Sequence, residues 1–504
     1  MGFQYRVALA FILIQSLIMS TLSVPTLQLD TAQAVLELPS RHGPAGLPVA
    51  NATRSFWIDT PGANPLAKEG SQGELTSDAD VCIIGSGITG VSAAYHLAKH
   101  FEGREDGGTP VKVVILEARD FCSGATGRNG GHLTPSVFLD FVNRELAYGP
   151  DEARKTYALE NYTASELINI IEAESLQRAV DFVASSHLSL LVTERELNFA
   201  KADFAAAQAA GLDLDHIEWV SGKDMSETYG TSFPASRYPG HNLWPLKLVA
   251  ELYKIALKTA PSKFSLKLHT NTPVTSITSA SSTSRRWSLS TPRGAIQCSY
   301  VIHATNGYSS HLLPHLQGPV GIVPTRGQVL ALRSASPLSE VTTASWGGNE
   351  GFEYWFPRPV ESGKEENPLI ILGGGREASG PNFEYYVTDD SVVQKTVGKV
   401  LRDFLPGVFP GKYEKGREPE MEWTGIMGFT KIGDPFVGPV VKSSELDTRE
   451  FEGQFIAAGY SGHGMTRAYA CAEAVAGMVA AKLTGTKWET PEWLPRHYLT
   501  TERP

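Results

Sequence analysis

The chain has 504 residues, which is too many for one hydrophobic core and predicts two or three compact units. Hydrophobic residues make up 42% of the sequence and charged residues 19%, a globular composition that excludes a largely disordered chain. The 54 acidic residues outnumber the 44 basic ones, and this acidity argues against a nucleic-acid partner, because phosphate binding needs a basic face.

The N-terminus has the layout of a secretory signal. A short start with Arg6 is followed by the apolar run VALAFILIQSLIMSTLSV, which has small residues near 20–23. We expect residues 1–23 to be a cleaved signal peptide or, because the run approaches membrane-spanning length, an uncleaved signal anchor; a buried N-terminal helix is the alternative. The protein would then be secreted or membrane-anchored, with Asn51 and Asn161 as glycosylation candidates, and a cytoplasmic location stays open.

The four cysteines do not decide the compartment. Cys82 falls in an apolar strand pattern and Cys471 in an alanine-rich helix, where free cysteine usually acts as a small core residue. Together with Cys122 and Cys298 they form no C-x-x-C pair and no disulfide framework. We therefore predict no metal site and no dithiol redox centre.

Regular structure begins after a segment of irregular composition. Residues 24–77 are rich in Pro, Gly, Ser and Thr, which predicts a linker or an arm that wraps over the surface. The following stretch, DADVCIIGSGITGVSAAYHLAKHF, predicts a short buried strand at Val81–Ile84 and a helix from Ile88. A second strand, VKVVILEAR, ends in Glu117.

The glycines between this strand and helix complete a dinucleotide-binding unit. Gly85 allows the tight turn, Gly87 lets the backbone approach a pyrophosphate, and Gly90 lets the helix pack close to the strand. The pyrophosphate would lie at the helix N-terminus, where free N–H groups favour anions. Glu117 would accept hydrogen bonds from ribose hydroxyls.

Two further glycine clusters indicate that the dinucleotide is a flavin. The first, GATGRNGGHLTP at Gly124–Pro135, follows Glu117 closely, where a ribityl chain and a flat ring would need more backbone beyond the pyrophosphate. The second, GQFIAAGYSGHGM, predicts a strand at Phe455–Ala458, a glycine turn and another helix N-terminus directed toward the cofactor.

A fourth glycine motif is a weaker match. Gly373–Ala378 has the spacing G-x-G-x-x-A, but Ser379-Gly380-Pro381 follows at once and would interrupt the helix that phosphate binding requires. No second strand with a terminal acid follows. We therefore expect no nicotinamide site there, and instead a turn that leads Arg376 toward a substrate pocket.

These segments resemble the D-amino-acid oxidase superfamily of FAD enzymes, which includes the sarcosine, glycine and γ-glutamylputrescine oxidases. The resemblance spans about residues 78–485 and rests on VCIIGSGITG, SGATGRNGG, AAGYSGHGM, VIHATNGY, PTRGQVL and EWTGIMGFTKIGDPFVGPV. VIHATNGY departs from the family pattern, because Asn306 is inserted before Gly307. GRNGGH is most similar to the γ-glutamylputrescine oxidase-like branch.

The resemblance implies FAD as the cofactor and a set of residues around it. In the loop after Glu117, Arg128 and Asn129 would face the ring edge or the substrate, while the glycines donate N–H bonds to the flavin. The implied cofactor-binding residues are Gly85, Ser86, Gly87, Gly90, Glu117, Ala118, Arg119, Gly124, Thr126, Gly127, Arg128, Asn129, Gly130, Gly131, Val274, Ala304, Gly307, Gly459, Gly462, His463, Gly464 and Met465.

The implied fold is α/β plus α+β. A Rossmann-like FAD-binding domain would be assembled from the discontinuous segments 78–140, 240–320 and 425–486. An antiparallel-sheet substrate domain would comprise 141–239 and 321–424, and 487–504 would be a C-terminal tail. Helical patterns at Glu152–Glu174 and Glu196–Ala210, and strand patterns in FEYWFPRP and PLIILGG, fit the substrate domain.

The implied reaction is oxidation of an amine or amino acid, in which a hydride passes to the flavin and oxygen or another acceptor takes the electrons. Arg128, Arg326 or Arg376 could fix a substrate carboxylate by paired hydrogen bonds, although each could equally be a surface or domain-bridging charge. His463 could bond the flavin carbonyl or the substrate. The partner would be this small molecule, and the apolar N-terminus would supply any membrane association.

The attachment of the flavin and the class of protein leave choices open. Where sarcosine oxidases carry a flavin-linked cysteine this chain has EWTGIMG, and where dimethylglycine dehydrogenase-like proteins place a linking histidine it has Arg128, with His132 close by. We therefore predict non-covalent FAD. The strand PLIILGGGR lacks the lysine that sarcosine-type oxidases use for oxygen, so the acceptor stays open. The alternatives are a non-catalytic FAD-binding protein and an FAD hydroxylase that uses NAD(P)H.

Overall fold

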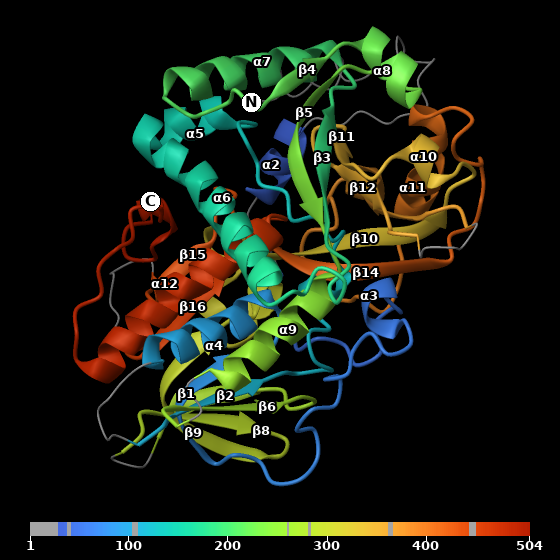
Figure 1. The fold of residues 1–504 in the computed structure, drawn as a ribbon. Helices are drawn as coiled ribbons and strands as arrows, with labels where there is room; N and C mark the ends of the chain where they lie inside the picture. Colours follow the sequence, from blue (N-terminus) through green and yellow to red (C-terminus); the bar gives the residue numbers. More distant parts are fainter. Residues whose placement is uncertain are drawn as a thin grey trace.

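The computed structural model describes residues 29–37, 42–102, 109–259, 262–280, 284–360, 366–442 and 450–503. Two eight-stranded sheets organise them, one in the lower and one in the upper part of the view, with long helices between and around them (Figure 1). The predicted signal segment, residues 1–23, lies outside the described residues. None of the helices in the described ranges is long and apolar enough to cross a membrane.

The first sheet has the arrangement expected of a Rossmann-like domain. Its main path runs through β15 (Phe436–Pro439), β16 (Gln454–Ala458), β9 (Gly294–His303), β1 (Asp78–Ile84), β2 (Val111–Leu116) and β6 (Phe264–His269), with β7 (Ser276–Ser279) and β8 (Trp287–Thr291) attached at β9. The five strands from β16 to β6 are parallel, and β15 is antiparallel to β16.

The parallel strands are apolar because both of their faces are covered. On one face Val81 and Ile83 pack against α4 (Ile88–Phe101), α9 (Pro245–Lys258) and α12 (Gly464–Thr484). On the other face Cys82 and Ile84 pack against the β7–β8 hairpin. The prediction of a Rossmann-like domain built from discontinuous segments is confirmed.

The second sheet is nearly all antiparallel. Its order is β14 (Met421–Phe429), β10 (Val323–Arg333), β13 (Leu369–Gly374), β12 (Glu353–Pro357), β11 (Ser345–Gly348), β3 (Val183–Leu190), β5 (Ala235–Asn242) and β4 (Glu218–Val220). Only the β11–β3 pair is parallel. The predicted domain boundaries at 239/240 and 424/425 fall inside β5 and β14, both of which belong to this sheet.

One face of the second sheet is apolar. Residues that alternate along the strands, such as Leu188, Trp346 and Leu372, pack against α8 (Gly222–Tyr229), α10 (Leu338–Val341) and α11 (Lys395–Val408). The opposite face is turned toward the first sheet, since Phe356, Val329 and Trp423 join the same core as α4 and α12.

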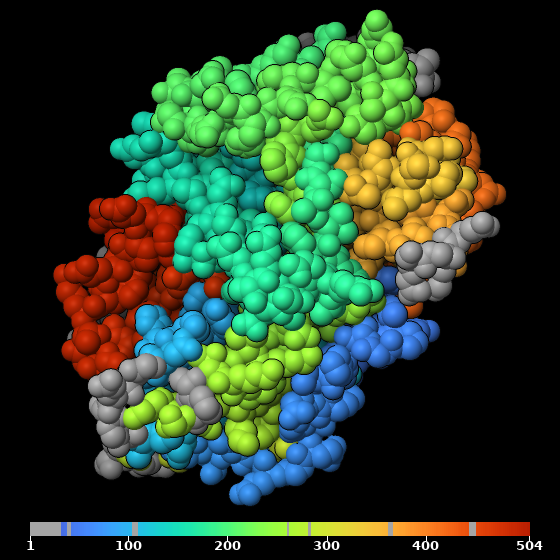
Figure 2. Space-filling model, in the orientation of Figure 1, coloured from blue at the N-terminus to red at the C-terminus, as the bar shows by residue number. Residues whose placement is uncertain are grey.

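The chain passes from the first sheet to the second through α5 (Phe141–Tyr148) and α6 (Pro150–Ala173), which follow β2 and precede β3, whereas α7 (Glu194–Ala209) lies between β3 and β4 of the second sheet. The predicted helices at 152–174 and 196–210 are α6 and α7; Pro150 opens α6, and Thr193 with Glu196 forms a capping box at the start of α7. Helix α6 packs against α12, and Figure 2 shows it lying across the middle of the molecule.

The N-terminal segment carries α2 (Leu29–Leu36) and α3 (Phe56–Asp59). Its residues after α3 run over the surface beside α9 (Figure 2). At α3, however, Ser55 and Trp57 are fully buried, so this part of the arm is inserted into the core. Short 3-10 turns occur at η1 (Ala125–Arg128), η2 (Asn306–His311), η3 (Pro314–Leu316), η4 (Gly318–Val320), η5 (Arg376–Ser379) and η6 (Arg496–Tyr498).

Candidate active site

The ends of four parallel strands bring the predicted flavin motifs to one edge of the first sheet. β1 leads to Gly85, β2 to Glu117, β9 to Ala304 and β16 to Gly459. The Gly85 N–H donates to Leu116 O at 2.8 Å, and the Ala304 N–H donates to Ile84 O at 3.0 Å. Ligands of open α/β sheets bind at this carboxyl edge.

The first glycine turn is too tight for any side chain. A Cβ atom on Gly85, whose φ is +109°, would lie 2.6 Å from Ala304 O, and one on Gly90 would lie 1.9 Å from Gly85 O. Gly87 is the residue immediately before α4, and a Cβ atom on it would lie 3.0 Å from Thr126 Oγ1. The three glycines therefore bring no side chain of their own to the helix N-terminus, where Thr126 Oγ1 accepts the Ile88 N–H at 3.1 Å, and such a turn fits the pyrophosphate of FAD.

Glu117 is held in place beside this turn. One carboxylate oxygen accepts hydrogen bonds from the Ser86 N–H at 3.0 Å and Ser86 Oγ at 2.8 Å, and the other accepts from the Arg119 N–H at 2.9 Å. A carboxylate offers about four acceptor sites, so capacity remains for ribose hydroxyls. The chemistry of these residues fits the nucleotide half of FAD.

The guanidinium of Arg128 is engaged within the protein. Its Nε donates to Ser123 O at 2.9 Å, and its Nη1 donates to Thr53 O at 2.8 Å and Thr424 O at 3.0 Å. Burial lowers its pKa to about 10, while Asp390, 3.6 Å away, works against that shift. Arg119 pairs with the same Asp390 at 2.9 Å. A role for Arg128 in holding the substrate stays a prediction.

The other two candidate arginines meet one segment, residues 383–389. Arg326 Nε donates to Glu384 at 2.5 Å, and its Nη1 donates to Asp389 O at 3.1 Å. Arg376 Nη1 donates to Phe383 O at 3.1 Å, and its guanidinium lies over the rings of Phe352, Tyr385 and Phe429. Both arginines therefore contact the segment 383–389, and the next residue of the chain, Asp390, is the partner of Arg119 and Arg128.

His463 occupies the position before α12 and lies beside a buried ionic network. Its Nδ1 is 3.6 Å from Glu160 Oε1 and 3.5 Å from Ser136 Oγ. Glu160 accepts from Arg467 at 2.7 Å, and Arg467 also contacts Asp434 at 3.2 Å. Burial alone would raise the pKa of Glu160, but the Arg467 guanidinium reverses this and the pKa is lowered. The catalytic role of His463 stays a prediction.

Asn306, the residue inserted into the Ala-Thr-Gly pattern, joins two of the glycine clusters. Its backbone has a φ of +44°, and its Oδ1 accepts the Gly459 N–H at 3.0 Å. A Cβ on the next residue, Gly307, would lie 2.4 Å from Met427 O on β14. The insertion was visible in the sequence, but its partner was not.

The remaining predicted residues are placed as follows. A Cβ atom on Gly130 would overlap the Tyr354 ring at 2.2 Å, and one on Gly131 would lie 2.8 Å from Leu243 O. The loop therefore lies directly on the second sheet. Gly124 and Gly462 have open space around them. Val274 and Met465 are buried in the core, Gly127 lies in η1, and Gly464 begins α12.

Sequence reasoning missed a polar region on the face of the second sheet toward the flavin domain. His187 on β3 lies opposite Tyr238 on β5, and Tyr354 follows on β12. The ring of His132 is 6.0 Å from that of His187 and 5.6 Å from that of Tyr354. Alternation in SSHLSL, with serine and histidine at every second position, was the signal that could have indicated this face.

Several groups of this polar face lack partners within the described residues. Both ring nitrogens of His132 and both amide atoms of Asn242 are buried with no hydrogen bond. Buried polar atoms are nearly always satisfied by protein, water or ligand. Burial lowers the pKa of His132 to about 4 and lowers that of His187, so both rings are neutral at pH 7. The face therefore offers neutral hydrogen-bonding groups.

Two buried glutamates lie near this region: Glu353 begins β12, where it alternates with Tyr354 and so lies on the other side of the sheet, and Glu377 lies in η5. Glu353 is fully buried and accepts from Asn349 Nδ2 at 2.7 Å and from the Gly375 N–H at 3.0 Å. Glu377 is buried, and its carboxyl group lies next to that of Glu353. Burial, with the neighbouring Glu377, raises the pKa of Glu353 well above its ordinary value, and burial raises that of Glu377.

The motif at Gly373–Ala378 does not form a dinucleotide turn. Its strand β13 lies between β10 and β12, and both pairings are antiparallel. The four-residue turn η5 follows and ends at Gly380, with no helix for a phosphate. Among the described residues, no group of three or more His, Cys, Asp or Glu side chains could hold a metal ion.

Known proteins match this chain over most of its length. The FAD dependent oxidoreductase family, DAO, matches residues 80–478. Gamma-glutamylputrescine oxidoreductase of Escherichia coli K12 is 27% identical over 421 residues, 81% of this chain and 84% of that protein. A probable oxidoreductase, OrdL, of Rhizobium meliloti is 24% identical over 427 residues, again 81% and 84% of the two chains.

Solved structures share the fold at lower identity. Glycine oxidase from Geobacillus kaustophilus is 19% identical with a TM-score of 0.57, covering 82% of this chain and 97% of that one. L-Amino acid deaminase from Proteus vulgaris, in a form lacking its specific insertion, is 18% identical with a TM-score of 0.60, covering 88% and 99%. Since the family match spans well over half of the sequence, the chain belongs to the DAO family of FAD-dependent oxidoreductases.

Proposed function

We propose that this enzyme oxidises the C–N bond of a small amine or amino acid, with FAD bound non-covalently and oxygen as the electron acceptor. The observation that carries the proposal is the neutral polar face of the second sheet, which lies against the loop that follows the FAD turn. The relative from E. coli is named as an oxidoreductase of γ-glutamylputrescine, which supports an amine as the substrate class.

When bound, FAD would accept a hydride from the carbon next to nitrogen, which leaves an imine for hydrolysis. The residues of this chain would bind and orient the reactants. The Gly85–Gly90 turn and Glu117 would hold the nucleotide, and the loop 124–131 would lie along the ring. His132, His187 and Tyr354 would orient the substrate by hydrogen bonds without adding charge, because both histidines are neutral at pH 7.

An anaerobic absorbance spectrum of the purified protein tests the proposal. We expect bound oxidised flavin that bleaches on addition of one class in a panel of primary amines, secondary amines and amino acids. Admission of oxygen should restore the oxidised spectrum and release hydrogen peroxide. Bound flavin that no amine or amino acid reduces would contradict the proposed reaction, and slow recovery in oxygen would contradict oxygen as the acceptor.

The attachment of the flavin has its own test. Acid precipitation should release all of the flavin into the supernatant, because neither a cysteine nor a histidine occupies the predicted linking positions. Flavin that stays with the precipitate would show a covalent bond.

We also propose that residues 1–23 direct the protein into the secretory pathway. The apolar run supports this, as does the exposure of both sequon residues, Asn51 in the arm and Asn161 on α6. Expression in a eukaryotic secretory host should give a mature N-terminus after about residue 23 and a mass decrease on glycosidase treatment. An intact, unglycosylated chain confined to the cytoplasm would contradict this location.

A further inference from the structure

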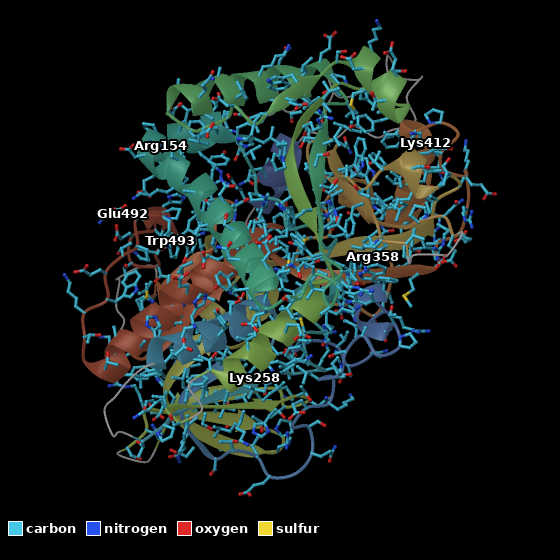
Figure 3. All side chains as sticks on the ribbon, viewed as in Figure 1. Arg154, Lys258, Arg358, Lys412, Glu492 and Trp493 are labelled. Atoms are coloured by element: carbon cyan, nitrogen blue, oxygen red, sulfur yellow. The ribbon has the colours of Figure 1, made fainter. Side chains whose placement is uncertain are left out.

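The N-terminal arm contacts the predicted flavin loop although it precedes the family match, which begins at residue 80. Trp57 is fully buried and lies 5.4 Å from the ring of Trp244 and 6.5 Å from that of Phe356. The Arg358 guanidinium lies 5.2 Å from the Trp57 ring, and Figure 3 shows it next to α3. These contacts fix the position of the Trp57 side chain.

Three consecutive carbonyl oxygens of the loop each accept a hydrogen bond from a side chain. Ser55 Oγ donates to Gly127 O at 2.7 Å. Trp423 Nε1, from β14, donates to Arg128 O at 2.9 Å. Trp57 Nε1 donates to Asn129 O at 2.6 Å. The arm and β14 together therefore hold this stretch of backbone in one orientation.

The orientation of these carbonyls decides where the neighbouring N–H groups point. In a planar trans peptide the C=O and N–H bonds point in opposite directions. When the Arg128 and Asn129 carbonyls are turned toward the two tryptophans, the N–H groups of Asn129 and Gly130 are turned away from them. The hydrogen bonds found among the described residues include none donated by either N–H group, whereas the next one, of Gly131, donates to Asn129 Oδ1 at 2.7 Å.

We propose that Ser55 and Trp57 are positioning residues of the cofactor site: with Trp423, they direct the N–H groups of Asn129 and Gly130 at the acceptor atoms along the edge of the flavin ring. This inference rests on the proposed function for the placement of the ring at this loop. Fixed donors aimed at developing negative charge stabilise it without reorganisation, so the same groups would favour the reduced flavin.

Two arm variants, Trp57→Phe and Ser55→Ala, test the proposal in the purified holoenzyme. Trp57→Phe removes the indole donor and keeps an aromatic ring, and Ser55→Ala removes one hydroxyl. The control is Trp287→Phe: Trp287 is also buried and its Nε1 donates to a backbone carbonyl, Glu452 O, at 3.0 Å, but it lies on β8. The measurements are the Kd for FAD, the flavin absorbance maxima and the flavin midpoint potential.

We expect the Kd of FAD to rise about 3- to 10-fold in Trp57→Phe, as for the loss of one hydrogen bond, and less in Ser55→Ala. Both variants should shift the absorbance maxima and lower the midpoint potential, whereas Trp287→Phe should change neither. If Trp57→Phe fails to fold, the same shifts in Ser55→Ala still support the inference.

Three other outcomes would overturn either the positioning role or the proposed function. Wild-type Kd, spectrum and potential in both arm variants would overturn the positioning role and leave the proposed function intact. Equal changes in Trp57→Phe and Trp287→Phe would show general destabilisation and would also overturn it. A wild-type protein that does not bind FAD would instead overturn the proposed function.

Discussion

The two sheets of this enzyme differ in where their polar and glycine residues lie. The parallel strands of the first sheet are apolar on both faces, and their polar and glycine residues are gathered at the strand ends. The second sheet packs one face against α8, α10 and α11, and its opposite face combines apolar side chains such as Val329 and Phe356 with glycines and neutral polar side chains. We therefore expect the first sheet to bind the cofactor at an edge and the second sheet to bind the substrate at a face.

The difference follows from strand direction. Parallel strands buried by helices can expose polar groups only where they end, and there the turns lie side by side. An antiparallel sheet can leave one face open to a ligand, and alternation then spreads the functional residues over many strands. Four predictions test this contrast, in order of the effect expected.

The largest effect should come from breaking the ionic link between the two regions. Arg467 on α12 joins Glu160 on α6 to Asp434, which lies between β14 and β15. Arg467→Met would leave two buried carboxylates without this partner, so the free energy of unfolding should fall by about 3–5 kcal/mol in denaturant titrations. The control Arg154→Met breaks an exposed pair with Asp151 and should cost less than about 1 kcal/mol. Equal losses would contradict a buried link.

A substitution at the edge of the first sheet should come next. A Cβ on Gly90 would lie 1.9 Å from the backbone oxygen of Gly85, which cannot move aside. Gly90→Ala should therefore lower the free energy of unfolding by about 3 kcal/mol and weaken FAD binding, despite the better helix propensity of alanine. In Gly124→Ala, where the space is open, unfolding should change by no more than about 0.5 kcal/mol.

The matching substitution on the face of the second sheet should cost less. A Cβ on Gly373 would lie 2.4 Å from the ring of Tyr354, which is a side chain and can rotate. Gly373→Ala should lower the free energy of unfolding by about 1 kcal/mol and raise KM for the amine substrate, because Tyr354 moves. Gly348→Ala, with its Cβ 3.4 Å from Leu190 Cβ, is the control. An unchanged KM would remove Tyr354 from the substrate region.

The smallest effect concerns pH. The folded-state pKa of Glu377 is raised by burial, so the folded protein binds its proton more tightly than the unfolded chain does. Stability from this group is present at low pH and is lost as the pH rises above 4.5, the ordinary value, and through the raised pKa. Glu377→Gln should reduce the fall in the free energy of unfolding between pH 5 and pH 8. An unchanged fall would contradict the raised pKa.

The edge of the first sheet was predictable because its signals are local. Gly85, Gly87 and Gly90 lie within one turn, and Glu117 ends the next strand, so short-range rules place them together. The two long helices α6 and α7 also followed from periodicity and caps. The four strand ends meet because parallel strands align their carboxyl ends.

The face of the second sheet was not predictable in the same way. Alternation shows that His187 and Tyr238 share a face with their strand neighbours, but not that this face meets His132 from a distant loop. The partners of Arg128 come from Thr53, Thr424 and Asp390, which no spacing rule connects. Composition indicated a surface arm for 24–77, whereas the aromatic pair Phe56-Trp57 was the local sign of an inserted segment.

The docking of the arm has a consequence for the order in which the protein is made. Ser55 and Trp57 leave the ribosome early, but the arm cannot complete its contacts until Asp390 and Thr424, which bond to Thr53, have also been synthesised. The segment that bonds to the flavin loop is therefore among the first to be translated, but its contacts can be completed only late in synthesis. A nascent chain released before β14 would lack one of the two tryptophan donors to the loop, Trp423, and with it the hydrogen bond to Arg128 O.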